Sequence, residues 1–292
     1  MTKQANRYTL RNRYLFKGNL VMQTALHIGG GRVSLSSSDS PIVLTPEEIP
    51  FIPGSSFKGS LRSTVEKFVP TLSNDLFSCA LIDLTDEEAE EERKLNRPVC
   101  STARQKEITQ KRRNNPGKEE AILKEARDKL CHTCQLFGSP FAAARISVND
   151  LYIPSGEWNG VLQLRDGVAI DRDSEKAKDR LKYDFEVVPA SATFDLEIML
   201  ENATDQDLQL ISVGLSEFVH GFATIGGKRS RGLGACLLSN LRVFALELTD
   251  TDEATRNIRL RNYLLERKFS NEEDGQTFLD KHISSLFANA PL

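Results

Sequence analysis

The segment that decides the fold is ATFDLEIMLENATDQDLQLISVGLSEFVHGF, residues 192–222. Residues 192–201 alternate apolar and polar side chains, a period of two that predicts a strand with one buried face. The apolar positions are Phe194, Leu196, Ile198 and Leu200. Residues 204–222 have apolar side chains at helical spacing behind Thr204, a residue type that commonly caps a helix N-terminus. The segment therefore predicts a strand followed directly by an amphipathic helix.

Matching elements lie on both sides of this segment. They are, in chain order, strand 14–28, helix 56–68 with Ser55 or Ser56 as its cap, strand 143–153 and strand 234–248. With a projection before residue 192, the order becomes strand, helix, strand, projection, strand, helix, strand. This is the βαββαβ order of ferredoxin-like and RNA-recognition-motif-like folds, so the chain is predicted to be an α+β protein.

Three segments lie outside this core. Residues 72–140 contain an acidic run, a basic run and most of the cysteines, which is typical of an insertion. Residues 154–190 are polar and charged and are predicted to project as a long hairpin, and residues 250–292 are predicted to form a helical extension. The expected organisation is one domain over 1–292, with its core in 14–70 and 140–248.

Composition bounds the class of protein. The 292 residues are 39% apolar and 27% charged, as in soluble globular proteins. No apolar run approaches the roughly 20 residues that span a bilayer. The N-terminus has bases but no apolar core, so we expect no signal peptide, no membrane partner and a cytoplasmic location. In that reducing setting the five cysteines are not expected to form disulfides, and Cys236, on a predicted strand, is expected to be a core residue.

Charge is spread unevenly along the chain. The formal net charge is only −3 at pH 7. Residues 83–92 carry seven acids, residues 104–129 carry nine Lys and Arg against five acids, and residues 226–232 carry three bases. A local basic patch can bind a polyanion even when the whole chain is slightly acidic.

Four cysteines lie in the insertion. Cys131 and Cys134 form a CxxC pair that can chelate one metal ion, and Cys79 and Cys100 lie upstream. A structural Zn²⁺ takes four sulfur or nitrogen ligands and would stabilise a segment with little core. The alternatives are scattered core thiols, or His132 in place of one cysteine. A deaminase zinc site does not fit, because no histidine begins an H-x-E motif.

The segment TIGGKRSRGLGA, residues 224–235, combines glycines with Lys228, Arg229 and Arg231. Glycines let a backbone approach a phosphate closely, and the cations supply positive charge. Nucleotide hydrolysis is not expected, because Gly227 occupies the position of the Walker lysine. The segment is either a phosphate-binding loop or an ordinary basic turn.

The segment PGSSFKGSLRS places four polar or basic side chains on the first turns of a predicted helix. They are Ser55, Ser56, Lys58 and Arg62. Free N–H groups at a helix start, flanked by cations, suit a phosphate. The alternative is a capped surface helix.

The segment SLSSSDSPIV, residues 34–43, contains one carboxylate, Asp39, in a run of serines. Taken by itself, Asp39 is expected to close an Asx-turn before Pro41.

Together these segments resemble one family. LHIGGGRVSLSSSDSPIV, IPFIPGSSFKGSLRS, RDGVAIDRDSEKAKDRLKYDFEVVP and GGKRSRGLGA occur in the order typical of the RAMP superfamily. More narrowly, they resemble the repeated backbone subunit of type III CRISPR effector complexes. The insertion is similar to that of subtype D-like and E-like members, where it binds zinc. The zinc ligands so implied are Cys79, Cys100, Cys131 and Cys134.

The resemblance implies a subunit that stacks along a CRISPR guide RNA beside other RAMP subunits and a large polymerase-like subunit. The hairpin, here 165–189, would act as a thumb that kinks the duplex of guide and target RNA. Asp39, directly before Ser-Pro, matches the acid with which active members cleave target RNA. The predicted RNA contacts are His27, Ser55, Ser56, Lys58, Arg62, Arg172, Gly226, Gly227, Lys228, Arg229 and Arg231.

The implied chemistry needs few protein groups, since RNA carries its own nucleophile, the 2′-OH. A kinked strand supplies the in-line geometry. An isolated Asp is a weak general base at pH 7, so Asp39 is expected to bind hydrated Mg²⁺ or Mn²⁺ or to orient the hydroxyl. The alternative is a non-catalytic guide-binding subunit of the same complex. A guide-processing ribonuclease is less expected, because such relatives commonly use a histidine.

Overall fold

The computed structural model describes residues 9–30, 38–72, 76–79, 85–94, 102–170, 177–249 and 252–288. Their centre is a five-stranded sheet in the order β3-β7-β1-β8-β9. The strands are β1 (Asn12–Met22), β3 (Ile146–Val148), β7 (Thr193–Glu201), β8 (Cys236–Glu247) and β9 (Asn271–Asp274). All four pairings are antiparallel.

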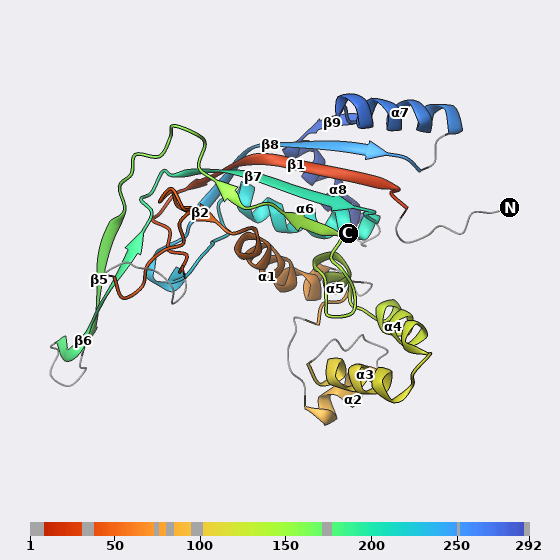
Figure 1. The fold of residues 1–292 in the computed structure, drawn as a ribbon, viewed down its shortest axis with the longest axis horizontal. Helices are drawn as coiled ribbons and strands as arrows, with labels where there is room; N and C mark the ends of the chain where they lie inside the picture. Colours follow the sequence, from red (N-terminus) through yellow and green to blue (C-terminus); the bar gives the residue numbers. More distant parts are fainter. Residues whose placement is uncertain are drawn as a thin grey trace.

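Two helices connect these strands and lie on one face of the sheet (Figure 1). They are α1 (Gly54–Leu72), which follows β1, and α6 (Asp205–Val219), which joins β7 to β8. Helix α8 (Gly275–Phe287) packs beside α6 and β8. Without β9, the sheet has the strand order and crossovers of a ferredoxin-like βαββαβ fold. The predicted fold class is therefore confirmed.

The sequence patterns explain which face is buried. Phe16 and Leu20 on β1, and Phe194 and Ile198 on β7, have no exposed surface and belong to the core cluster under the helices. Thr204 caps α6, and its side chain exchanges capping-box hydrogen bonds with Asp207, as a helix N-terminus requires.

Other boundaries differ from the predictions. Helix α1 begins at Gly54, before the predicted serine cap, because the Asp150 carboxylate accepts a hydrogen bond of 2.7 Å from the Gly54 N–H. The predicted strand 143–153 is divided into β3 and β4 (Leu151–Tyr152), and β4 pairs with β2 (Phe51–Ile52). Strand β9 was not predicted, because its four residues NEED have no apolar alternation.

The hairpin and the insertion extend in different directions from the sheet (Figure 1). Strands β5 (Gln163–Ile170) and β6 (Ala177–Val187) form a separate two-stranded antiparallel sheet. The insertion contains α2 (Asp86–Lys94), α3 (Thr102–Asn114), α4 (Glu119–Asp128) and α5 (His132–Phe137). Helix α7 (Glu253–Glu266) follows β8 and lies near the opposite face from α6. Among the described helices, none is both long and apolar enough to cross a membrane.

Gly214 allows the two core helices to approach closely, and this gives a test of the packing. A Cβ at this position would lie 2.6 Å from Leu61 Cδ1 and 2.7 Å from Val65 Cγ2 on α1. We expect Gly214→Leu to lower the free energy of unfolding by about 1–3 kcal/mol through overpacking. Urea unfolding measures this, with Gln206→Leu on the exposed side of α6 as the control. Equal stability of the two variants would contradict the close packing.

Candidate RNA interface and metal centre

Asp39 lies at the root of the hairpin, where the loop after β1 contacts β6. The Asp39 N–H donates to Asp184 Oδ1 at 2.7 Å, and the Asp184 N–H donates to Asp39 Oδ2 at 3.1 Å. Two residues further on, the Glu186 N–H donates to the Ser40 carbonyl at 3.2 Å. Asp39 is exposed, so its carboxylate is held in place yet accessible. This is more than the local Asx-turn expected from its immediate neighbours.

The glycine-rich loop lies against the other side of β6. Lys228 has a left-handed backbone conformation, and residues Arg229–Arg231 form the short 3-10 helix η1. The Lys228 ammonium lies 4.4 Å from the centroid of the Phe185 ring, and the Arg231 guanidinium donates to the Tyr183 hydroxyl. These are cation–π and charge-assisted contacts that hold the cations near the hairpin. Arg229 is exposed.

His27 joins these two surfaces. It is only 7% exposed, and its Nδ1 lies 2.8 Å from the Glu186 carbonyl oxygen. The Gly227 N–H donates to the His27 carbonyl at 2.8 Å. At Gly226, where φ is +85°, a Cβ would lie 2.5 Å from the His27 oxygen, so glycine is needed for this approach. His27 therefore holds the loops together, and a contact between its ring and RNA stays a prediction.

The predicted contacts on α1 have other partners. Lys58 Nζ donates to the Ile146 carbonyl at 3.1 Å, and burial, with the nearby charge of Arg62, lowers the pKa of Lys58. Arg62 donates to Glu66 at 2.8 Å and to Cys134 Sγ at 3.3 Å. Lys58 is thus bonded to strand β3 and Arg62 to the insertion. Ser55 and Ser56 lie in the first turn of α1, and the expectation of free N–H groups there is wrong for Gly54, which Asp150 caps.

Three of the predicted zinc ligands converge. Cys79 Sγ lies 3.5 Å from Cys131 Sγ and 3.6 Å from Cys134 Sγ, and all three sulfurs lie within 4.8 Å of one another. Tetrahedral ligands at about 2.3 Å from Zn²⁺ place sulfurs about 3.8 Å apart. Cys131 and Cys134 are fully buried, and the guanidinium of Arg62 would stabilise thiolate charge. The cluster can therefore hold a metal such as zinc, and the alternative of scattered thiols does not apply to these three.

Cys100 and His132 are the two candidates for a fourth ligand. Cys100, like Arg172, lies outside the described residues. His132 is adjacent to the cluster, but its Nδ1 accepts a hydrogen bond of 3.0 Å from the Phe77 N–H. Cys236 is elsewhere, fully buried in the main core as predicted, and burial raises the pKa of its thiol to about 12.

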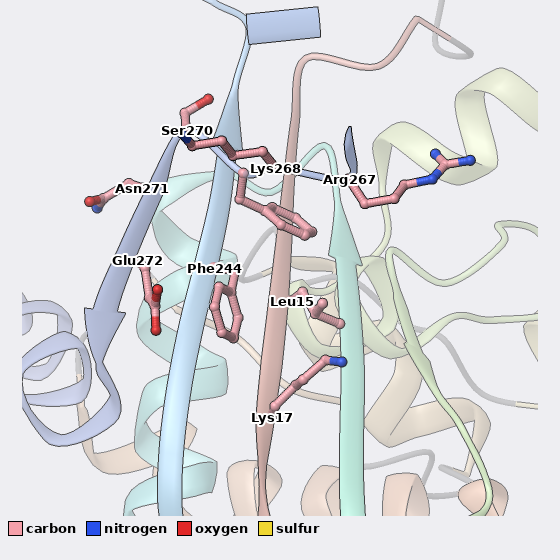
Figure 2. A pocket seen from close by; sticks show the side chains of 9 residues that line it. Leu15, Lys17, Phe244, Arg267, Lys268, Ser270, Asn271 and Glu272 are labelled. Carbon is pink, nitrogen blue, oxygen red and sulfur yellow. The ribbon is translucent and has the colours of Figure 1, made fainter. Parts of the chain in front are cut away.

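A separate pocket of about 540 Å³ lies on the open face of the sheet, opposite α6 (Figure 2). Figure 2 shows Leu15 and Lys17 of β1, Phe244 of β8 and residues of the α7–β9 connection around it. None of the predicted site residues lines this pocket. It is therefore distinct from the candidate RNA interface at the root of the hairpin.

Sequence reasoning missed the contribution of β6. Tyr183 and Phe185 face the glycine-rich loop, whereas Asp184 and Glu186 bond to residues 39–42. The alternation of aromatic and acidic side chains in KYDFEVVP has the period of a strand. That pattern could have identified a two-faced strand, although not its partners.

Fold and site together define a protein with an RNA-recognition-motif-like fold whose acidic and basic loops meet on a projecting hairpin. The RAMP superfamily model matches residues 19–237, so this chain belongs to the RAMP superfamily. The family resemblance expected from the sequence motifs is confirmed.

Three relatives share the name CRISPR system Cms endoribonuclease Csm3. The one from Methanothermobacter thermautotrophicus is 39% identical over 64 residues, and the one from Enterococcus italicus is 44% identical over 55 residues. These matches cover 21% and 18% of this chain and only 26% of each relative. The relative from Streptococcus thermophilus is 23% identical over 246 residues, which are 78% of this chain and 87% of the relative.

The cysteine cluster predicts one zinc ion per chain. We expect Cys134→Ala to lose most of the zinc and to make α3 and α4 sensitive to proteolysis, because the insertion has only a small core around these cysteines. Elemental analysis and limited proteolysis measure the two effects, and Cys236→Ala is the control for removal of a buried thiol. Wild-type protein with little zinc, or Cys134→Ala with full zinc, would refute the metal centre.

Proposed function

We propose that this chain is a guide-RNA-binding backbone subunit of a type III CRISPR ribonucleoprotein that cleaves complementary target RNA, with Asp39 at the cleavage site. The observation that carries the proposal is the exposed Asp39 carboxylate, bound to the hairpin strand that also contacts Lys228 and Arg231. A carboxylate for chemistry and cations for a phosphate backbone thus lie on two sides of one strand. Membership of the RAMP superfamily and the name of the relatives, an endoribonuclease, support the same proposal.

Guide binding in this proposal is independent of sequence. The glycine-rich loop offers exposed cations and a close backbone approach, which suit phosphates rather than base edges. Base pairing between guide and target then reads the sequence, while the protein holds backbone and shape. Other RAMP subunits and a large polymerase-like subunit are the proposed neighbours, and the hairpin is the proposed thumb.

Cleavage would use the target RNA's own 2′-OH. The 2′-OH gives up its proton to water as its oxygen attacks the adjacent phosphorus, and the bond from phosphorus to the 5′ oxygen breaks. The leaving 5′ oxygen takes up a proton from water, so the products are a 2′,3′-cyclic phosphate and a 5′-OH. Asp39, anchored through Oδ2, would orient the hydroxyl or hold a hydrated Mg²⁺ or Mn²⁺ with the substrate phosphate. When bound, the ion would neutralise charge on the phosphate. A hard oxygen donor that is exposed and fixed fits such an ion.

Replacing Asp39 tests the catalytic assignment. We expect Asp39→Ala to lower the single-turnover rate of target cleavage by about 10²-fold or more, with guide content and target binding unchanged. Gel analysis of labelled target in the assembled complex measures the rate, and Asp195→Ala, an exposed acid on β7, is the control. If the complex with Asp39→Ala still cleaves target RNA at the full rate opposite this subunit, the catalytic assignment is wrong. The chain would then be a guide-binding subunit without catalysis.

Replacing Arg229 tests guide binding. We expect Arg229→Ala to weaken binding of guide RNAs of any sequence and to reduce the slope of log affinity against log salt by about 1, because one phosphate contact is lost. Filter binding across a salt series measures both quantities. Arg256→Ala, an exposed arginine on α7, should change neither. Equal slopes for Arg229→Ala and wild type would place the guide elsewhere.

A further inference from the structure

The root of β6 presents different chemistry on its two faces. Tyr183 and Phe185 point toward the glycine-rich loop, and their rings stack with centroids 6.2 Å apart. Gly167 on β5 leaves room for the Tyr183 ring, since a Cβ there would lie 2.3 Å from it. Asp184 and Glu186 alternate with these aromatics and therefore face the segment 38–42. The position of β6 is thus fixed from the aromatic side.

The acidic face binds the Asp39 segment through side chains as well as backbone. Asp184 and Asp39 exchange hydrogen bonds at 2.7 and 3.1 Å, and Glu186 Oε2 accepts from the Ile42 N–H at 3.1 Å. The first bond fixes the backbone of Asp39 and the second fixes the rotation of its carboxylate. Asp39 Oδ1 takes part in neither of these bonds. Asp184 therefore restricts both the position and the orientation of the proposed catalytic group.

Within the hairpin, Asp184 lies opposite another acid. Asp184 is directly opposite Asp166 in the register of β5 and β6. Like charges at opposed positions destabilise an antiparallel pair. Outside the hairpin, the Asp184 carboxylate contacts the Asp39 N–H.

We infer that Asp184 is a positioning residue for target cleavage, acting through Asp39; the inference rests on the proposed function. The Asp184 carboxylate acts as a hydrogen-bond acceptor that holds the Asp39 backbone against β6. Without it, Asp39 is tied to β6 at this point only by the weaker 3.1 Å bond from the Asp184 N–H. Because β6 also contacts Lys228 on its other face, the same strand sets the distance between guide-binding loop and cleavage site.

Two substitutions at one position test this role in the assembled complex. Asp184→Ala removes the acceptor and should lower the single-turnover cleavage rate by about 10- to 100-fold, since a displacement near 1 Å costs about 10²-fold. Asp184→Asn removes the charge but keeps an oxygen acceptor, and should stay within about threefold of wild type. Guide content and target affinity should be unchanged in both, so the effect falls on the rate alone.

The outcomes separate this inference from the proposed function. Cleavage by Asp184→Ala at the wild-type rate, while Asp39→Ala is inactive, overturns the positioning role alone. An Asp184→Asn variant as slow as Asp184→Ala also overturns it, because charge rather than hydrogen bonding would then be required. Cleavage by Asp39→Ala at the wild-type rate overturns the proposed function itself.

Discussion

The structure depends on backbone hydrogen bonds made by the short segment that leaves β1, residues 23–30. Leu26 exchanges hydrogen bonds of 2.9 and 2.8 Å with Val188 at the end of β6. The His27 carbonyl accepts from Gly227, and the Ile28 carbonyl accepts from the Val43 N–H at 2.9 Å. Hairpin, glycine-rich loop and Asp39 loop are thus fixed to one piece of chain. The distances between the hairpin, the glycine-rich loop and the Asp39 loop are therefore set by residues 23–30, which continue the central strand β1.

These backbone hydrogen bonds explain why a buried histidine and two glycines lie next to the exposed cations of the glycine-rich loop. His27 is buried because its carbonyl and ring nitrogen both bond to neighbouring segments. Gly226 and Gly234 have φ near +80° and lie so close to backbone oxygens that a Cβ would reach 2.5 and 2.0 Å from them. Glycine at these positions lets the loop backbone pass close to its neighbours. The loop backbone and the contacts of Lys228 and Arg231 with Phe185 and Tyr183 together position the cations.

The elements and sites that depend on local sequence pattern could be predicted from the sequence. Alternation in 192–201 and the cap at Thr204 specify β7 and α6 by themselves, and the CxxC pair pointed to the cysteine cluster. Contacts between distant segments were not predictable in this way. Arg62 was assigned to RNA from its place on a helix start, but its partner Cys134 is 72 residues away. Asp39 and Asp184 are 145 residues apart, and no local pattern indicates their hydrogen bonds.

Electrostatics also favours the hairpin root over the β7 side of the sheet as the proposed RNA surface. RNA-recognition motifs stack bases on aromatic side chains of the open sheet face. Here the matching positions of β7 carry Asp195, Glu197 and Glu201, and the nearby Lys17 and Arg13 are paired with two of these acids. Acids whose neighbouring cations are already paired disfavour a polyanion on this part of the sheet. At the end of β1, by contrast, β6 and the glycine-rich loop bring aromatic rings and cations together.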